Sequence, residues 1–146
     1  FGMELGKGLD SRVTLSDPCE VMISSAHPLA EKKVINPRDL KGIPIVLNRA
    51  QDTQPSAGQI AGMYANMGLS ENKRMYADDF YSIALIINTG IAFSIMPASI
   101  VHWGIDGVVF RPIQGFKAKA RTLLVYPRGS QDPGIQSFVS LVKPKY

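Results

Sequence analysis

A polar segment at residues 48–56 carries side chains that suit the binding of a small anion. It contains the guanidinium of Arg49, three amides and two hydroxyls. It follows a compact apolar run at residues 43–47 and leads into a helix that the spacing of apolar residues predicts at about residues 55–67. Open α/β sheets bind ligands at such a junction, and the N–H groups and dipole of a helix start favour an anion. The same segment also fits an ordinary polar loop with a capping residue.

The other residues that could act in catalysis or bind a metal are the two histidines and one pair of adjacent carboxylates. His27 and His102 lie 75 positions apart, and neither has the neighbours of a metal ligand. Asp78 and Asp79 stand where a helix is expected to begin, and carboxylates there usually cap the helix. The sequence therefore predicts no catalytic residue, no metal site and no cofactor. The alternative is an enzyme that uses Asp78, Asp79 or His27, which would show turnover and a strongly perturbed pKa in a cleft.

Hydrophobic periodicity predicts an α/β fold. Apolar residues at i, i+3, i+4 and i+7 predict helices at about residues 55–67, 79–89 and 133–142, and each helix is expected to pack one apolar stripe on a sheet. The N-terminal part predicts two strands, at residues 12–15 and 19–25, around a turn at residues 16–18. Further strands are expected at residues 43–47, 74–77, 91–96, 107–112 and 118–126. Strand and helix segments alternate along the chain, as in α/β domains.

Composition limits the classes of protein that the sequence can represent. Hydrophobic residues make up 45% and charged residues 19% of the chain, an ordinary globular balance. The apolar runs are too short to cross a bilayer, so no membrane partner is expected. The net charge of +4 is scattered, which favours a mildly basic solvated surface over a nucleic-acid-binding face. Cys19 is the only cysteine, which fits a reducing cytosol without excluding the periplasm.

Five segments, taken in order, resemble the effector-binding domain of LysR-type transcriptional regulators. They are Glu20-Val21-Met22-Ile23 with His27-Pro28-Leu29-Ala30, then residues 39–46, residues 89–99, residues 107–113, and the strand at residues 121–126. The resemblance covers essentially the whole chain. One departure is Ala92, which stands where the family pattern has a second glycine.

The resemblance implies a type II periplasmic-binding-protein-like fold with two lobes. Residues 1–22 would form the hinge and part of the first lobe, residues 23–112 the complete second lobe, and residues 113–146 the returning hinge and the C-terminal part of the first lobe. Most of the first lobe and a winged helix-turn-helix domain would precede Phe1. DNA would then be bound only through that upstream domain.

The resemblance also implies a ligand site and a set of partners. The ligand-binding residues would be Arg49, Gln51, Thr53, Gln54, Ser56 and Phe80. The ligand would be a small organic anion, the protein a cytoplasmic homo-oligomer, and its function the sensing of an effector that controls transcription. The alternative is a periplasmic solute-binding protein of a transporter with the same fold. An upstream signal peptide would support that alternative, and an upstream helix-turn-helix would exclude it.

Overall fold

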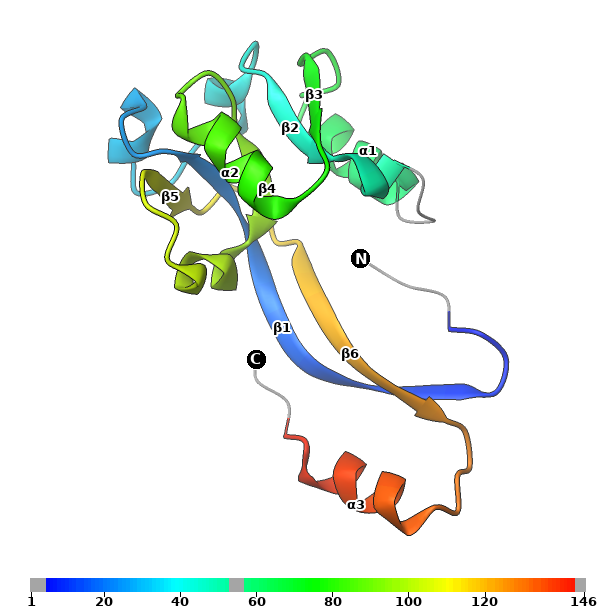
Figure 1. Cartoon of the computed structure of the whole chain (residues 1–146). Helices are drawn as coiled ribbons and strands as arrows, with labels where there is room; N and C mark the ends of the chain where they lie inside the picture. Colours follow the sequence, from blue (N-terminus) through cyan, green and yellow to red (C-terminus); the bar gives the residue numbers. More distant parts are fainter. Residues whose placement is uncertain (1–4, 53–56, 144–146) are drawn as a thin grey trace.

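The computed structural model describes residues 5–52 and 57–143, without the side chains of residues 51 and 52. The chain forms a compact body, residues 19–116, and an arm, residues 5–18 and 117–143, that extends away from it (Figure 1). All the buried apolar side chains of the described residues lie in the body, between Cys19 and Ile113. No helix in the described ranges is long and apolar enough to cross a membrane.

Strand β1 (Leu9–Ser24) runs through both parts of the molecule. Its first half pairs antiparallel with β6 (Lys119–Pro127) in the arm, and its second half lies between β4 (Ser94–Pro97) and β5 (Val108–Arg111) in the body. The sequence-based prediction of two strands around a turn at residues 16–18 is therefore wrong.

The ladder to β6 explains why residues 16–18 do not turn. These three residues remain paired with Arg121, Ala120 and Lys119, and the only shift in register comes earlier, between Val13 and Leu15. The Asp17 carboxylate accepts a hydrogen bond from the Ser99 N–H, at 3.0 Å, instead of closing a local turn. Pro18 has no N–H to donate, and it stands where β1 changes partner from β6 to β4.

The body is a sheet between two helices, as the α/β prediction requires. β2 (Ile45–Asn48) pairs parallel with β3 (Arg74–Ala77), and a bridge from Ile45 to Phe93 joins this pair to the segment that enters β4. α1 (Ala57–Asn66) and α2 (Phe80–Asn88) confirm two of the three expected helices.

Alternation along β2 places the two helices on opposite faces. Ile45 and Leu47 belong to the core cluster that contains Met63 and Tyr64 of α1. Val46 belongs to the cluster that contains Ile83, Ala84 and Ile87 of α2. Successive side chains of a strand point to opposite faces, so a short apolar strand supplies both cores at once.

In the described part of the body, four short 3₁₀ helices complete the structure. They are Pro28–Glu31, Pro37–Leu40, Arg49–Asp52 and Ala98–Trp103. His27 caps the first, because its Nδ1 accepts the Leu29 N–H at 3.1 Å, so this histidine is a loop residue, as expected. Asn36 caps the second with a reciprocal capping box.

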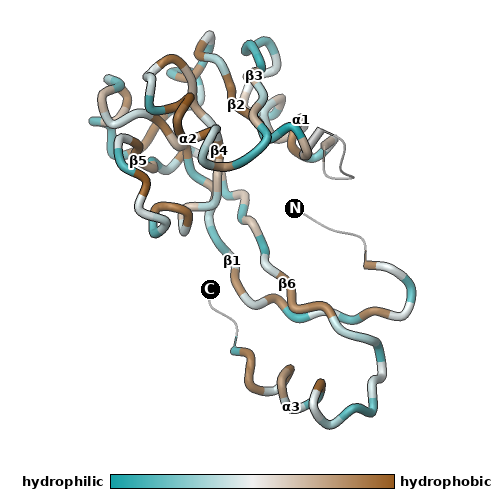
Figure 2. The backbone as a smooth tube through the Cα atoms, in the orientation of Figure 1, coloured by the Kyte–Doolittle hydropathy of each residue, from teal (hydrophilic) through white to brown (hydrophobic). Residues whose placement is uncertain are grey.

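α3 (Pro133–Leu141) confirms the third helix but not its expected packing. None of its residues is buried, and Phe138 and Leu141 are 58% and 76% exposed. Figure 2 shows hydrophobic colour along this helix at the far end of the arm. The Arg12 guanidinium fastens its last turn by donating to the carbonyl oxygens of Val139 and Val142. The apolar stripe is only partly covered: Ile135 and Val139 are half-buried near Tyr126 and Pro127 of β6, whereas Phe138 and Leu141 are exposed.

Candidate functional site

The loop that follows β2 meets the turn that precedes α2. The parallel register pairs Asn48 with Ala77, so the carboxyl ends of β2 and β3 lie side by side. The Asn48 side-chain amide donates to the backbone oxygen of Asp78 at 3.4 Å, and Arg49 Nε donates to Asp78 Oδ1 at 2.8 Å. Two segments that are about thirty positions apart in sequence therefore form one edge of the body.

Arg49 has a partner that the sequence did not predict. Its guanidinium pairs with Asp78 and lies 5.9 Å from the centre of the Tyr76 ring. Both charged side chains are well exposed, at 63% for Arg49 and 78% for Asp78. The expected positive charge is present, but a carboxylate of the same chain already contacts it.

The adjacent carboxylate, Asp79, caps α2 as expected. It accepts hydrogen bonds from the Ser82 N–H at 2.9 Å and from the Ser82 hydroxyl at 2.7 Å. These hydrogen bonds, that of the hydroxyl foremost, lower the pKa of the Asp79 carboxyl. Asp79 is therefore the capping residue, and Asp78 is the partner of Arg49.

The other expected ligand residues are only partly covered by the structure. Thr53, Gln54 and Ser56 lie outside the described residues, as does the side chain of Gln51. Phe80 begins α2, with its ring edge-on to Trp103 at 5.0 Å, and it packs against the core cluster of α2. Arg49 and Phe80 thus follow the carboxyl ends of neighbouring strands, β2 and β3.

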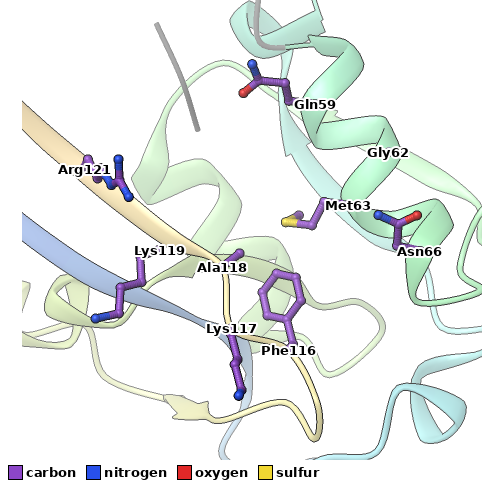
Figure 3. A pocket seen from close by; sticks show the side chains of 9 residues that line it. All are labelled: Gln59, Gly62, Met63, Asn66, Phe116, Lys117, Ala118, Lys119 and Arg121. Atoms are coloured by element: carbon purple, nitrogen blue, oxygen red, sulfur yellow. The ribbon is translucent and has the colours of Figure 1, made fainter.

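A hollow of about 740 Å³ lies between α1 and the start of β6 (Figure 3). Its lining residues are Gln59, Gly62, Met63, Asn66, Phe116, Lys117, Ala118, Lys119 and Arg121. This volume lies within the range of small-molecule sites. The hollow begins in the first turn of α1, immediately after the polar segment that was expected to bind ligand.

One wall of the hollow is basic. Three cationic residues, Lys117, Lys119 and Arg121, line it where the chain enters β6. Among the residues that the structure describes, no acidic side chain lines the hollow, while Met63 and Phe116 add apolar surface to it. The hollow therefore offers positive charge beside an apolar floor.

Sequence reasoning missed this wall for identifiable reasons. Residues 117–121 were expected to belong to a scattered solvated surface, although their alternation with alanine was a visible signal. The lining face of α1 also repeats at i, i+3, i+4 and i+7, at residues 59, 62, 63 and 66. That face is mostly polar, so an apolar stripe could not reveal it.

Cys19 and the possible metal ligands belong to no chemical site in the described chain. Cys19 is buried, and burial raises the pKa of its thiol, which disfavours the reactive thiolate. Within residues 5–52 and 57–143, no three histidine, cysteine or carboxylate side chains gather closely enough to hold a metal ion.

Comparison with known proteins identifies relatives of the whole chain. A family model described as the LysR substrate binding domain matches residues 1–146. The Hca operon transcriptional activator HcaR of Escherichia coli K12 is 22% identical over 137 residues, which are 94% of this chain and 46% of HcaR. The chain thus spans about half the length of this relative.

Solved structures reproduce the fold. HinK, a LysR family transcriptional regulator from Pseudomonas aeruginosa, superposes with a TM-score of 0.76 at 18% identity, over 97% of this chain and 50% of HinK. The effector-binding domain of QuiR, solved in complex with shikimate, gives a TM-score of 0.73 at 18% identity, over 95% of this chain and 66% of that domain. These likenesses confirm the expected type II periplasmic-binding-protein-like fold.

Proposed function

Because the chain belongs to the LysR substrate-binding domain family, we propose that it is the effector-sensing part of a LysR-type transcriptional regulator. The observation that carries this proposal is the hollow between α1 and β6, which joins a basic wall to an apolar floor. The relatives favour this function over transport, since HcaR is a transcriptional activator and HinK a transcriptional regulator. Regulation by a bound effector requires no catalytic residue.

In this proposal the body contains the second lobe of a two-lobe sensor. Residues 23–112 form that lobe, and residues 1–22 and 113–146 form the hinge and part of the first lobe. The effector binds between the lobes and favours one angle between them, which is a shift of population between two states. The crossing strands β1 and β6 carry that change, because they are the two segments that leave the body.

In this proposal the whole regulator binds DNA through a domain that lies outside this chain. We place a winged helix-turn-helix domain upstream, and we propose a cytoplasmic homo-oligomer whose subunit arrangement changes with the lobe angle. The sensor itself is proposed not to catalyse a reaction. Its ligand is a small organic anion.

The expected ligand residues remain part of this proposal, with one refinement for Arg49. Arg49, Gln51, Thr53, Gln54, Ser56 and Phe80 would contact the ligand from the second lobe. The Arg49–Asp78 pair is exposed, and exposed pairs contribute only about 0–1 kcal/mol. A ligand carboxylate can therefore compete with Asp78 for the Arg49 guanidinium.

Calorimetric titration of the effector domain, extended upstream to include the whole first lobe, tests whether it senses small molecules. The panel contains benzoate, succinate, citrate and shikimate, together with neutral benzamide and glycerol. We expect saturable binding of at least one acid, and a rise in Tm at saturation, because a ligand held only by the folded state stabilises it by about 2.7 kcal/mol at 100 times its Kd. Absence of both effects for every compound would contradict the proposed function.

A further inference from the structure

The basic wall of the hollow lies outside the loop from which the ligand site was predicted. We propose, on the basis of the effector-sensing function above, that Arg121 anchors the carboxylate of an aromatic acid whose ring lies against Met63 and Phe116. The ligand class follows from the described lining, in which cationic and apolar side chains surround one space and no acidic residue is present. Figure 3 shows the Arg121 side chain on β6 across the hollow from α1.

The position of Arg121 suits an anchor. Its backbone pairs with Ser16 of β1, so the side chain leaves a strand that is held in register. Among the residues that the structure describes, its guanidinium forms no hydrogen bond or ion pair, since the ion pairs there belong to Lys32, Arg49 and Arg128. A guanidinium presents a rigid fork of donors that matches a carboxylate with two parallel bonds.

Arg121 and Arg49 therefore differ in what a ligand would have to displace. A carboxylate that binds Arg49 competes with Asp78, which is already 2.8 Å from its Nε. A carboxylate that binds Arg121 has no side chain of the described residues to displace from its guanidinium. The amides of Gln59 and Asn66 line the opposite side of the hollow and can orient polar groups of the ligand.

The apolar floor selects the rest of the ligand. Met63 is 9% exposed and belongs to the core cluster of α1, against which Phe116 also packs. The Phe116 N–H donates to the Ile113 oxygen at 3.2 Å, which fixes the turn that carries the ring. A thioether and an aromatic ring make favourable contacts with a planar aromatic ligand.

This placement also couples the ligand to the lobe angle. Met63 is on a helix of the body, whereas Arg121 is on the strand that runs into the arm. A ligand held by both connects the body with the arm. Its binding energy then depends on how β6 leaves the body.

The test compares benzoate with benzamide, which share a ring and differ in charge, in the same extended effector domain. Calorimetry should show that benzoate binds, that benzamide binds about tenfold more weakly, and that Arg121→Gln weakens benzoate about tenfold without changing benzamide, as loss of one charge-assisted bond predicts. Arg38→Gln is the control, because it removes the same charge at an exposed position outside the hollow. Circular dichroism confirms that each variant is folded.

The outcomes separate this inference from the function on which it rests. If benzoate binds equally well to the parent, Arg121→Gln and Arg38→Gln, then Arg121 is not the anchor, although a ligand is sensed. If succinate or citrate binds and benzoate does not, the aromatic class is wrong and effector sensing stands. If no compound of the panel binds, the proposed function itself fails. Phe116→Leu should weaken benzoate and benzamide alike, since both lose the same ring contact.

Discussion

The body and the arm carry similar sequence patterns but reach different degrees of burial. In the body, α1 and α2 place their stripes on opposite faces of one sheet, and buried residues such as Tyr64 and Ile87 are at most 1% exposed. In the arm, α3 has an equivalent stripe, yet it buries no residue. An apolar stripe therefore indicates which face of a helix can be buried, and the surface opposite that face determines whether it is buried.

The two parts are also held together by different forces. The body is held by packed apolar side chains, which contribute about 25 cal/mol for each Å² removed from water. The arm is held by the β1–β6 ladder, by Arg12 on the end of α3, and by the exposed Arg128–Asp10 pair at 3.0 Å. A two-stranded ribbon is marginal on its own, so we expect the arm to open locally before the body unfolds.

The largest effect should come from the centre of the body. Phe93 is fully buried, and its backbone joins β2 to the sheet by bonding Pro44 and Val46. Phe93→Ala should lower the free energy of unfolding by about 3–5 kcal/mol, because a cavity replaces the ring. Urea denaturation followed by circular dichroism measures this loss. A loss below about 1 kcal/mol would mean that the core cluster of Phe93 and α1 does not carry the stability of the chain.

The next effect concerns a backbone position at the edge of the body. Gly107 has φ of +81°, and a Cβ there would lie 2.3 Å from Asn88 Oδ1. The φ angle alone costs a non-glycine residue about 1–3 kcal/mol, and displacement of Asn88 adds to that cost. Gly107→Ala should therefore destabilise the chain more than Gly115→Ala, a matched control with φ of +73° and no atom within 4 Å of its Cβ. Equal urea midpoints for the two variants would show that displacement of Asn88 adds nothing to the cost of the positive φ angle.

The sequence predicted the body better than the arm or the site. The stripes of α1 and α2 and the doubly buried β2 follow from local periodicity, which reports burial when both faces of a sheet are covered. The continuation of β1 through residues 16–18 depends on the ladder to β6, whose residues lie about one hundred positions away. The pairing of Arg49 with Asp78 and the basic wall at Arg121 likewise depend on tertiary contacts. The residue types therefore predict a positive charge but not the residues that contact it.

A smaller effect should come from a polar contact inside the core cluster that contains Met63 and Tyr64 of α1. Tyr64 is 1% exposed, and its hydroxyl accepts the Ile95 N–H at 3.3 Å. Tyr64→Phe should cost about 0.5–1.5 kcal/mol at neutral pH, the net value of one neutral hydrogen bond. Denaturation in urea at pH 7 gives the difference. A variant as stable as the parent would show that this contact adds nothing to the packing of the ring.

The same tyrosine should make the stability of the body depend on alkaline pH. Burial raises the pKa of the Tyr64 hydroxyl, so the phenol keeps its proton in the folded state above about pH 10, where an unfolded tyrosine loses it. The stabilisation is therefore fully present below the unfolded pKa, and it is lost as the pH rises from there through the higher pKa of the folded state. Urea midpoints between about pH 9 and 11 should fall more steeply for the parent than for Tyr64→Phe. Parallel curves would contradict this role for Tyr64.

The smallest effect should come from the apolar stripe of α3, because this stripe of the arm buries no residue. Phe138 is 58% exposed and contributes to no core cluster of the described residues. Phe138→Ala should change the free energy of unfolding by less than about 0.5 kcal/mol, as do most substitutions of exposed side chains. The measurement is the same urea titration as for Phe93→Ala, so one protocol compares a phenylalanine of the body with one of the arm.

A loss of about 2 kcal/mol or more would indicate a buried ring. If that loss grew with protein concentration, a second copy of the chain would be covering α3, because mass action stabilises only the associated form. A small loss at all concentrations would leave the ring in water, and the difference between the body and the arm would stand.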